Sequence, residues 1–66
     1  MRLTVNGEIK EAPDQAILAD YLASLGIDSG RIAVERNLEI APKSQWSAIR
    51  LAEGDRLEIV QFVGGG

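Results

Sequence analysis

The chain has 66 residues, of which 45% are apolar and 26% charged, and its formal net charge is −3. This balance predicts one small globular domain and not a disordered segment. The sequence has no Cys and no His, which excludes disulfides, zinc sites built from those residues and a His-dependent catalytic triad. The negative charge argues against nucleic acid and anionic membranes as partners. Without a membrane-spanning stretch or a signal-peptide-like start, we expect a cytoplasmic domain that binds no metal or cofactor itself.

The first eleven residues predict a β-hairpin. Apolar and polar residues alternate over residues 1–5, which is the pattern of a half-buried strand. Asn6-Gly7 follows, and this pair favours a type I′ turn because such a turn needs positive φ at both central residues. We expect residues 8–11 to return as a second strand with Ile9 directed into the core.

An amphipathic helix is expected next, from Gln15 to Leu25. Asp14 is placed to cap its N-terminus, and Gly26 suits the left-handed position after its last turn. A helix of about three turns is not stable alone, so it must cover a sheet. Its apolar residues fall on one side of a helical projection: Ile17, Leu18, Tyr21, Leu22 and Leu25.

The second half predicts three further strands and one short helical turn. We expect strands at residues 31–35, 39–40 and 56–63, and the turn at residues 43–46. Ile32 and Val34 should face the core, and Trp46 should pack against the edge of the sheet. The last strand is rich in Leu, Ile, Val and Phe, so it should be central.

This order of elements predicts an α+β domain of the β-grasp type, a mixed sheet of four to five strands covered on one face by one α-helix. We expect the domain to occupy residues 1–63, followed by a flexible glycine tail at residues 64–66. No pair of carboxylates has a spacing that suggests acid/base catalysis, so no catalytic residue is predicted. Most acidic residues are expected on solvated faces and turns: Glu8, Glu11, Asp20, Glu53 and Asp55.

The single helix can cover only one of the two faces of the last strand. If Leu57 and Ile59 face the helix, then Val60 and Phe62 lie on the uncovered face of the sheet. Exposed apolar side chains in one patch are typical of a docking site. The alternative is that the loop around Trp46 covers them.

The chain resembles the ThiS family of bacterial thiamine-biosynthesis sulfur carriers, which are ubiquitin-like, over essentially its whole length. The segments that carry the resemblance are residues 3–8, the Val-Glu-Arg-Asn segment at residues 34–37, and residues 53–66. One variation is Gly64, a third glycine before the Gly-Gly pair.

The resemblance implies that the chain is a protein cosubstrate and not an enzyme. In this family an E1-like adenylyltransferase, ThiF, uses ATP and Mg²⁺ to adenylate the terminal glycine, here Gly66. Sulfur from a cysteine desulfurase then gives a thiocarboxylate, and thiazole synthase, ThiG, takes that sulfur. Gly64 and Gly65 would enter the partner's active site. The free protein is expected to be a monomer, and the expected docking residues are Glu58, Val60, Phe62 and Val63.

Two alternatives remain open from the sequence. A carrier like the small subunit of molybdopterin synthase uses the same terminal chemistry, but it is typically longer and usually has prolines before the Gly-Gly. A β-grasp domain that only binds a partner would need no free terminal carboxylate.

Overall fold

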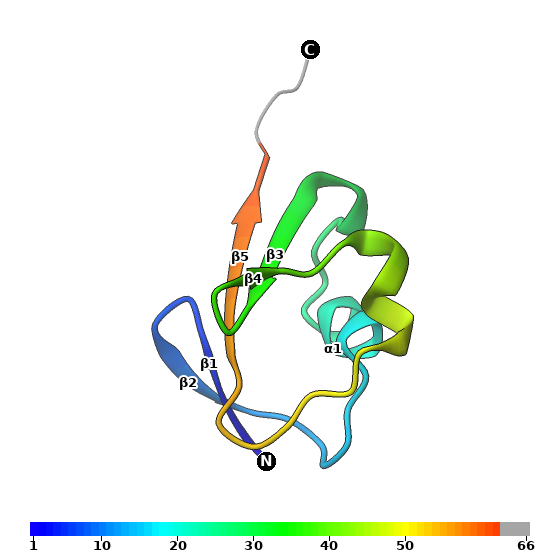
Figure 1. Cartoon of the computed structure of the whole chain (residues 1–66). Helices are drawn as coiled ribbons and strands as arrows, with labels where there is room; N and C mark the ends of the chain where they lie inside the picture. Colours follow the sequence, from blue (N-terminus) through cyan, green and yellow to red (C-terminus); the bar gives the residue numbers. More distant parts are fainter. Residues whose placement is uncertain (63–66) are drawn as a thin grey trace.

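The computed structural model describes residues 1–62 and shows a five-stranded mixed sheet with one α-helix against one face (Figure 1). The strand order is β2-β1-β5-β3-β4, with β1 parallel to β5 and the other neighbours antiparallel. The predicted β-grasp arrangement, with the last strand at its centre, is therefore confirmed. The elements are β1 (Arg2–Val5), β2 (Glu8–Glu11), α1 (Leu18–Ser24), η1 (Ser29–Arg31), β3 (Ile32–Arg36), β4 (Glu39–Ile40), η2 (Lys43–Ala48) and β5 (Arg56–Gln61).

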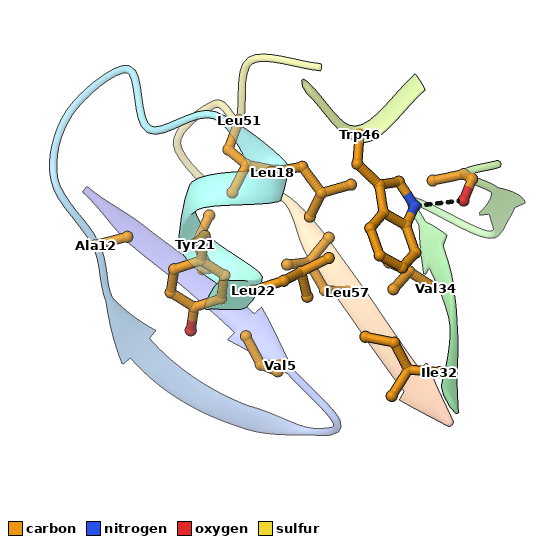
Figure 2. Close-up of a cluster of buried hydrophobic side chains, with 12 residues drawn as sticks. Val5, Ala12, Leu18, Tyr21, Leu22, Ile32, Val34, Trp46, Leu51 and Leu57 are labelled. Atoms are coloured by element: carbon orange, nitrogen blue, oxygen red, sulfur yellow. Dashed lines mark hydrogen bonds between the residues drawn. The ribbon is translucent and has the colours of Figure 1, made fainter. Parts of the chain in front are cut away.

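The core lies between α1 and the covered face of the sheet (Figure 2). Leu18 and Leu22 of α1 are 0% and 1% exposed, as the apolar side of the predicted helix requires. Burying a leucine side chain contributes about 1.5–3 kcal/mol to stability, so these contacts hold the helix on the sheet. The strands supply the facing side chains Leu3, Val5, Ile32, Val34 and Leu57.

The helix begins later than the predicted Gln15. Gln15 has φ +63°, and Ile17 is extended and pairs with Arg50 in an isolated bridge. The backbone N–H of Leu18 donates to the carbonyl of Ile49 at 2.8 Å. Helical dihedral angles at residues 15–17 would break this pairing with a distant segment, so α1 starts only at Leu18.

The predicted helix cap at Asp14 is accordingly wrong. Its carboxylate instead accepts a hydrogen bond from the N-terminal ammonium of Met1 at 3.1 Å, and this bond raises the pKa of the ammonium. At the other end of α1, Gly26 has φ +72°, as predicted for the residue that follows a helix. No helix in the described residues is long and apolar enough to cross a membrane.

The hairpin forms as predicted, but Ile9 faces away from the core. Asn6-Gly7 has φ values of +49° and +82°, which confirms the expected turn. Ile9 pairs with Thr4, whereas Lys10 pairs with the buried Leu3. Neighbouring residues of a strand point to opposite faces, so this register leaves Ile9 68% exposed on the uncovered face.

Trp46 closes one side of the core (Figure 2). It lies in η2 and is 5% exposed, and its indole N–H donates to the carbonyl of Ala41 at 2.7 Å. Its predicted position is therefore confirmed. The loop around it does not cover Val60 and Phe62, which are 58% and 56% exposed.

The two-residue turn between β3 and β4 contains an unfavourable residue, Leu38. Asn37 and Leu38 have φ values of +52° and +71°, and the Leu38 side chain is 84% exposed. A left-handed backbone costs a residue with a β-carbon about 1–2 kcal/mol, whereas glycine adopts it freely. We expect Leu38→Gly to raise Tm by a few degrees in a thermal melt. Glu39→Gly, which lies in a strand, should lower Tm, and a lower Tm for Leu38→Gly would show that the leucine makes a stabilising contact.

Candidate functional site

Asp55 is a buried carboxylate at the start of β5 and not the solvated turn residue that the sequence predicts. Its side chain accepts hydrogen bonds from Arg36 Nε at 2.9 Å, Asn37 Nδ2 at 3.0 Å and the backbone N–H of Ala52 at 2.8 Å. Only 6% of the residue is exposed. The other four acidic residues of that prediction are exposed: Glu8, Glu11, Asp20 and Glu53.

The Arg36-Asn37 pair of the Val-Glu-Arg-Asn segment ties the β3–β4 turn to β5. The Asn37 side-chain oxygen accepts from the backbone N–H of Arg56 at 2.9 Å. Burial alone would raise the pKa of Asp55, but the hydrogen bonds from Asn37, Ala52 and Arg36 and the charge of Arg36 together hold it below its ordinary value. An ionised acceptor of this kind organises the start of β5.

Asn6 holds the next part of β5. Backbone pairing of β1 with β5 covers Thr4 with Arg56 and Val5 with Leu57. Beyond it, the Asn6 side chain accepts from the backbone N–H of Ile59 at 2.7 Å and donates to its carbonyl at 3.1 Å. The Asn6 side chain therefore replaces backbone pairing to β5 at Ile59, beyond the last paired residue of β1. The sequence identified Asn6 only as a turn residue.

These contacts fix the direction in which the chain leaves the sheet. The backbone N–H of Phe62 donates to the carbonyl of Arg31 at 2.7 Å. Figure 1 shows that β5 ends at the opposite end of the sheet from the N-terminus. The predicted site residues beyond this point lie outside the described residues, as does the predicted boundary between domain and tail: Val63, Gly64, Gly65 and Gly66.

The uncovered face of the sheet carries an exposed apolar strip that ends beside this exit. Leu57 is 1% exposed and Ile59 packs against the core, whereas Val60 and Phe62 face outward, as predicted. Val60 pairs with Ala33 of β3, and Ile40 of β4 is 77% exposed and pairs with the next outward residue of β3. We call these residues the open-face strip: Ala33, Ile40, Val60 and Phe62.

Two acidic residues lie within this surface. Glu58 of β5 pairs with Glu35 of β3 on the uncovered face, and both are exposed. Together with Ala33, Ile40 and Val60 they line a shallow hollow. The structure thus brings the predicted docking residues Glu58, Val60 and Phe62 onto one face. Sequence reasoning missed Ile40 and Glu35, because only the strand pairing places them beside β5.

The comparisons with known proteins agree with this architecture. Residues 3–66 match the model of the ThiS family. The chain is 40% identical over 65 residues to the sulfur carrier protein ThiS of Bacillus subtilis, covering 97% of this chain and 98% of that protein. Its fold is similar to the crystal structure of the thiamine biosynthesis protein ThiS from Geobacter metallireducens, with a TM-score of 0.87, 29% identity and full coverage of both chains.

Two longer proteins are also similar to the chain. It is 47% identical over 66 residues to a thiazole synthase of Paramagnetospirillum magneticum and 36% identical over 66 residues to one of Magnetococcus marinus. The chain spans only 20% of the length of each of these relatives. A family model that covers nearly every residue, together with a carrier of matching length, shows that the chain belongs to the ThiS family of small sulfur carriers.

Proposed function

We propose that this chain carries sulfur for the formation of the thiazole ring of thiamine, with the carboxylate of Gly66 as the reacting group. The observation that carries the proposal is the match to a Bacillus sulfur carrier across 98% of that protein. The same match favours a thiamine carrier over the small subunit of molybdopterin synthase. The chain would act as a cosubstrate, because the reaction uses its terminal acyl group, whereas ATP, Mg²⁺ and the sulfur come with the partner enzymes.

The proposed chemistry begins with activation of a poor electrophile. The Gly66 carboxylate attacks the α-phosphate of ATP on the adenylyltransferase ThiF, where Mg²⁺ is also held, and pyrophosphate leaves. A cysteine desulfurase supplies the sulfur as a persulfide, whose terminal sulfur displaces AMP from the acyl adenylate. A thiol then cleaves the resulting acyl disulfide, which releases the thiocarboxylate and leaves a disulfide. The resulting thiocarboxylate donates its sulfur to thiazole synthase, ThiG. Gly64 and Gly65 suit a narrow active-site entrance because glycine has no side chain.

The longer relatives support thiazole synthase as the acceptor. Proteins named thiazole synthase contain a segment similar to this whole chain within a polypeptide about five times as long. Carrier and acceptor would then be held together covalently in those proteins. We expect the open-face strip to form part of the contact between carrier and acceptor.

The test is the mass of the protein isolated from its native host. Replacement of the terminal OH by SH adds about 16 mass units, a change that intact-protein mass spectrometry resolves. We expect this species in cells that are making thiamine, and also after reaction with ThiF, ATP, Mg²⁺ and a sulfur donor in vitro. An unmodified mass under both conditions would contradict the proposal and favour a domain that only binds.

The open-face strip should be needed for docking but not for folding. We expect Val60→Asp or Phe62→Asp to weaken binding to ThiF or ThiG by about 30-fold, since an apolar hot-spot side chain contributes about 2 kcal/mol or more. Both side chains are more than half exposed, so Tm should stay within a few degrees of the wild-type value. Isothermal titration calorimetry and a thermal melt measure the two effects.

Ile9→Asp is the matched control for this pair. Ile9 is 68% exposed on the same face, but it lies on the edge strand β2, two strands away from Val60. It should leave both affinities unchanged. If either test substitution unfolds the domain, the strip belongs to a core and the assignment of faces is wrong.

A further inference from the structure

Two carboxylates face each other on the uncovered side of the two most extensively paired strands. Glu35 of β3 and Glu58 of β5 are direct cross-strand partners, and both are exposed. Like charges in this position destabilise a sheet. The ion pairs within residues 1–62 involve other carboxylates, and Arg56, two residues before Glu58 on the same face, pairs with neither. The fold therefore keeps a repulsive pair that it does not neutralise.

The other residues that line the hollow with this pair are apolar. Ile40 and Val60 are 77% and 58% exposed, and with Ala33 they form the walls of the hollow that contains both glutamates. A lysine or arginine has the matching shape, because its long apolar stem packs against aliphatic side chains while its charged head reaches carboxylates. When a partner covers the hollow and excludes water, the attraction between opposite charges becomes stronger.

We propose that thiazole synthase docks on this hollow by placing a basic side chain, a lysine or an arginine, between Glu35 and Glu58. The inference rests on the proposed function and specifies the kind of group that the carrier surface recognises. Thiazole synthase is the chosen occupant because two proteins of that name contain a segment similar to this chain. In such polypeptides one covalent chain contains the carrier-like segment and the rest of the synthase.

The decisive experiment compares stability with affinity in the double variant Glu35→Gln, Glu58→Gln. Removing the repulsion should raise Tm of the free protein by about 1–5 °C. The same change should weaken binding to purified thiazole synthase by about tenfold or more, because a basic group of the synthase loses its partners. The wild-type affinity should fall as NaCl is raised, and the affinity of the double variant should fall less.

Glu39→Gln is the matched control. Glu39 is also an exposed glutamate outside any ion pair of the described chain, but it neighbours Ile40 on β4 and so points to the other face. It should change neither affinity nor its salt dependence. A purely structural role of the two glutamates would move Tm and affinity in the same direction.

Three results would overturn the inference. One is wild-type affinity of the double variant for thiazole synthase, and another is a lower Tm. The third is a loss of affinity seen only with ThiF, which would assign the hollow to the activating enzyme. The proposed function is judged separately, since formation of the thiocarboxylate on the wild-type chain does not depend on any of these results.

Discussion

A chain extended by one residue after Gly66, or carrying valine at position 65, should form thiocarboxylate at least about 100-fold more slowly than the wild type. The extension moves the reacting carboxylate to another residue. The valine adds a branched side chain to a segment that, in the proposed reaction, would enter the active site of ThiF, where an error in position of about 1 Å can cost about 100-fold in rate. Intact mass, measured at successive times during reaction with ThiF, ATP, Mg²⁺ and a sulfur donor, gives both the rate and the final yield of thiocarboxylate.

Neither change should alter the fold. Positions 65 and 66 are glycines in the wild type, and a glycine contributes no side chain to a core, so we expect Tm of both variants to equal the wild-type value. A protease site that restores Gly66 as the last residue provides the control, because cleavage should return the full yield. Full yield from the uncleaved extended chain would show that Gly66 is not the site of sulfur attachment.

The sequence predicts well those features that depend on local pattern. The structure confirms the alternation over residues 1–5 and the turn at Asn6-Gly7. The apolar side of the helix is confirmed for Leu18, Tyr21 and Leu22, whereas Leu25, at the end of the helix, is 39% exposed. The apolar composition of residues 56–63 also predicts the central strand correctly, although β5 ends at Gln61. The composition does not predict burial, because Val60 and Phe62 lie exposed on the uncovered face. Together these features were enough to predict the β-grasp fold.

The errors arise where a distant segment decides the local structure. The helix starts late because residues 16–18 pair with residues 49–51, and no local signal shows that pairing. Ile9 faces outward because the register with β1 places Lys10 opposite Leu3. A four-residue strand with one strongly apolar residue does not determine its own face.

The residues of the candidate site also fall into two groups, those that the local sequence pattern predicts and those that only the strand pairing reveals. Alternation along β5 correctly places Val60 and Phe62 on the uncovered face. It says nothing of Ile40 and Glu35, which reach the same surface through the pairing of β3 with β4 and β5. The two side-chain donors to Asp55 also lie far away in sequence, with Arg36 and Asn37 separated from it by 19 and 18 residues.

Asp55 is the one polar residue that is buried in the described part of the chain, so its replacement should cost more stability than replacement of an exposed carboxylate. Asp55→Asn keeps the shape of the side chain but replaces one acceptor oxygen with a donor, which would face the N–H groups of Arg36, Asn37 or Ala52. A buried donor without a partner costs about 1–3 kcal/mol, and more when a charged group is involved. We expect a loss of about 2–4 kcal/mol in the free energy of unfolding, measured by urea denaturation at pH 7. Asp20→Asn, at an exposed position of α1, is the control and should change stability by less than about 0.5 kcal/mol.

The stability difference between wild type and Asp55→Asn should also depend on pH. The folded state holds the pKa of Asp55 below the reference value of 3.8, so the carboxylate stabilises the fold fully above about pH 4. Protonation as pH falls through the folded pKa removes that contribution from the wild type, whereas the variant has no such group to titrate. The two proteins differ only at position 55, so the difference in stability should shrink between about pH 4 and pH 2. A difference that stays constant to pH 2 would show that the ionised form of Asp55 is not what the hydrogen bonds from Arg36 and Asn37 stabilise.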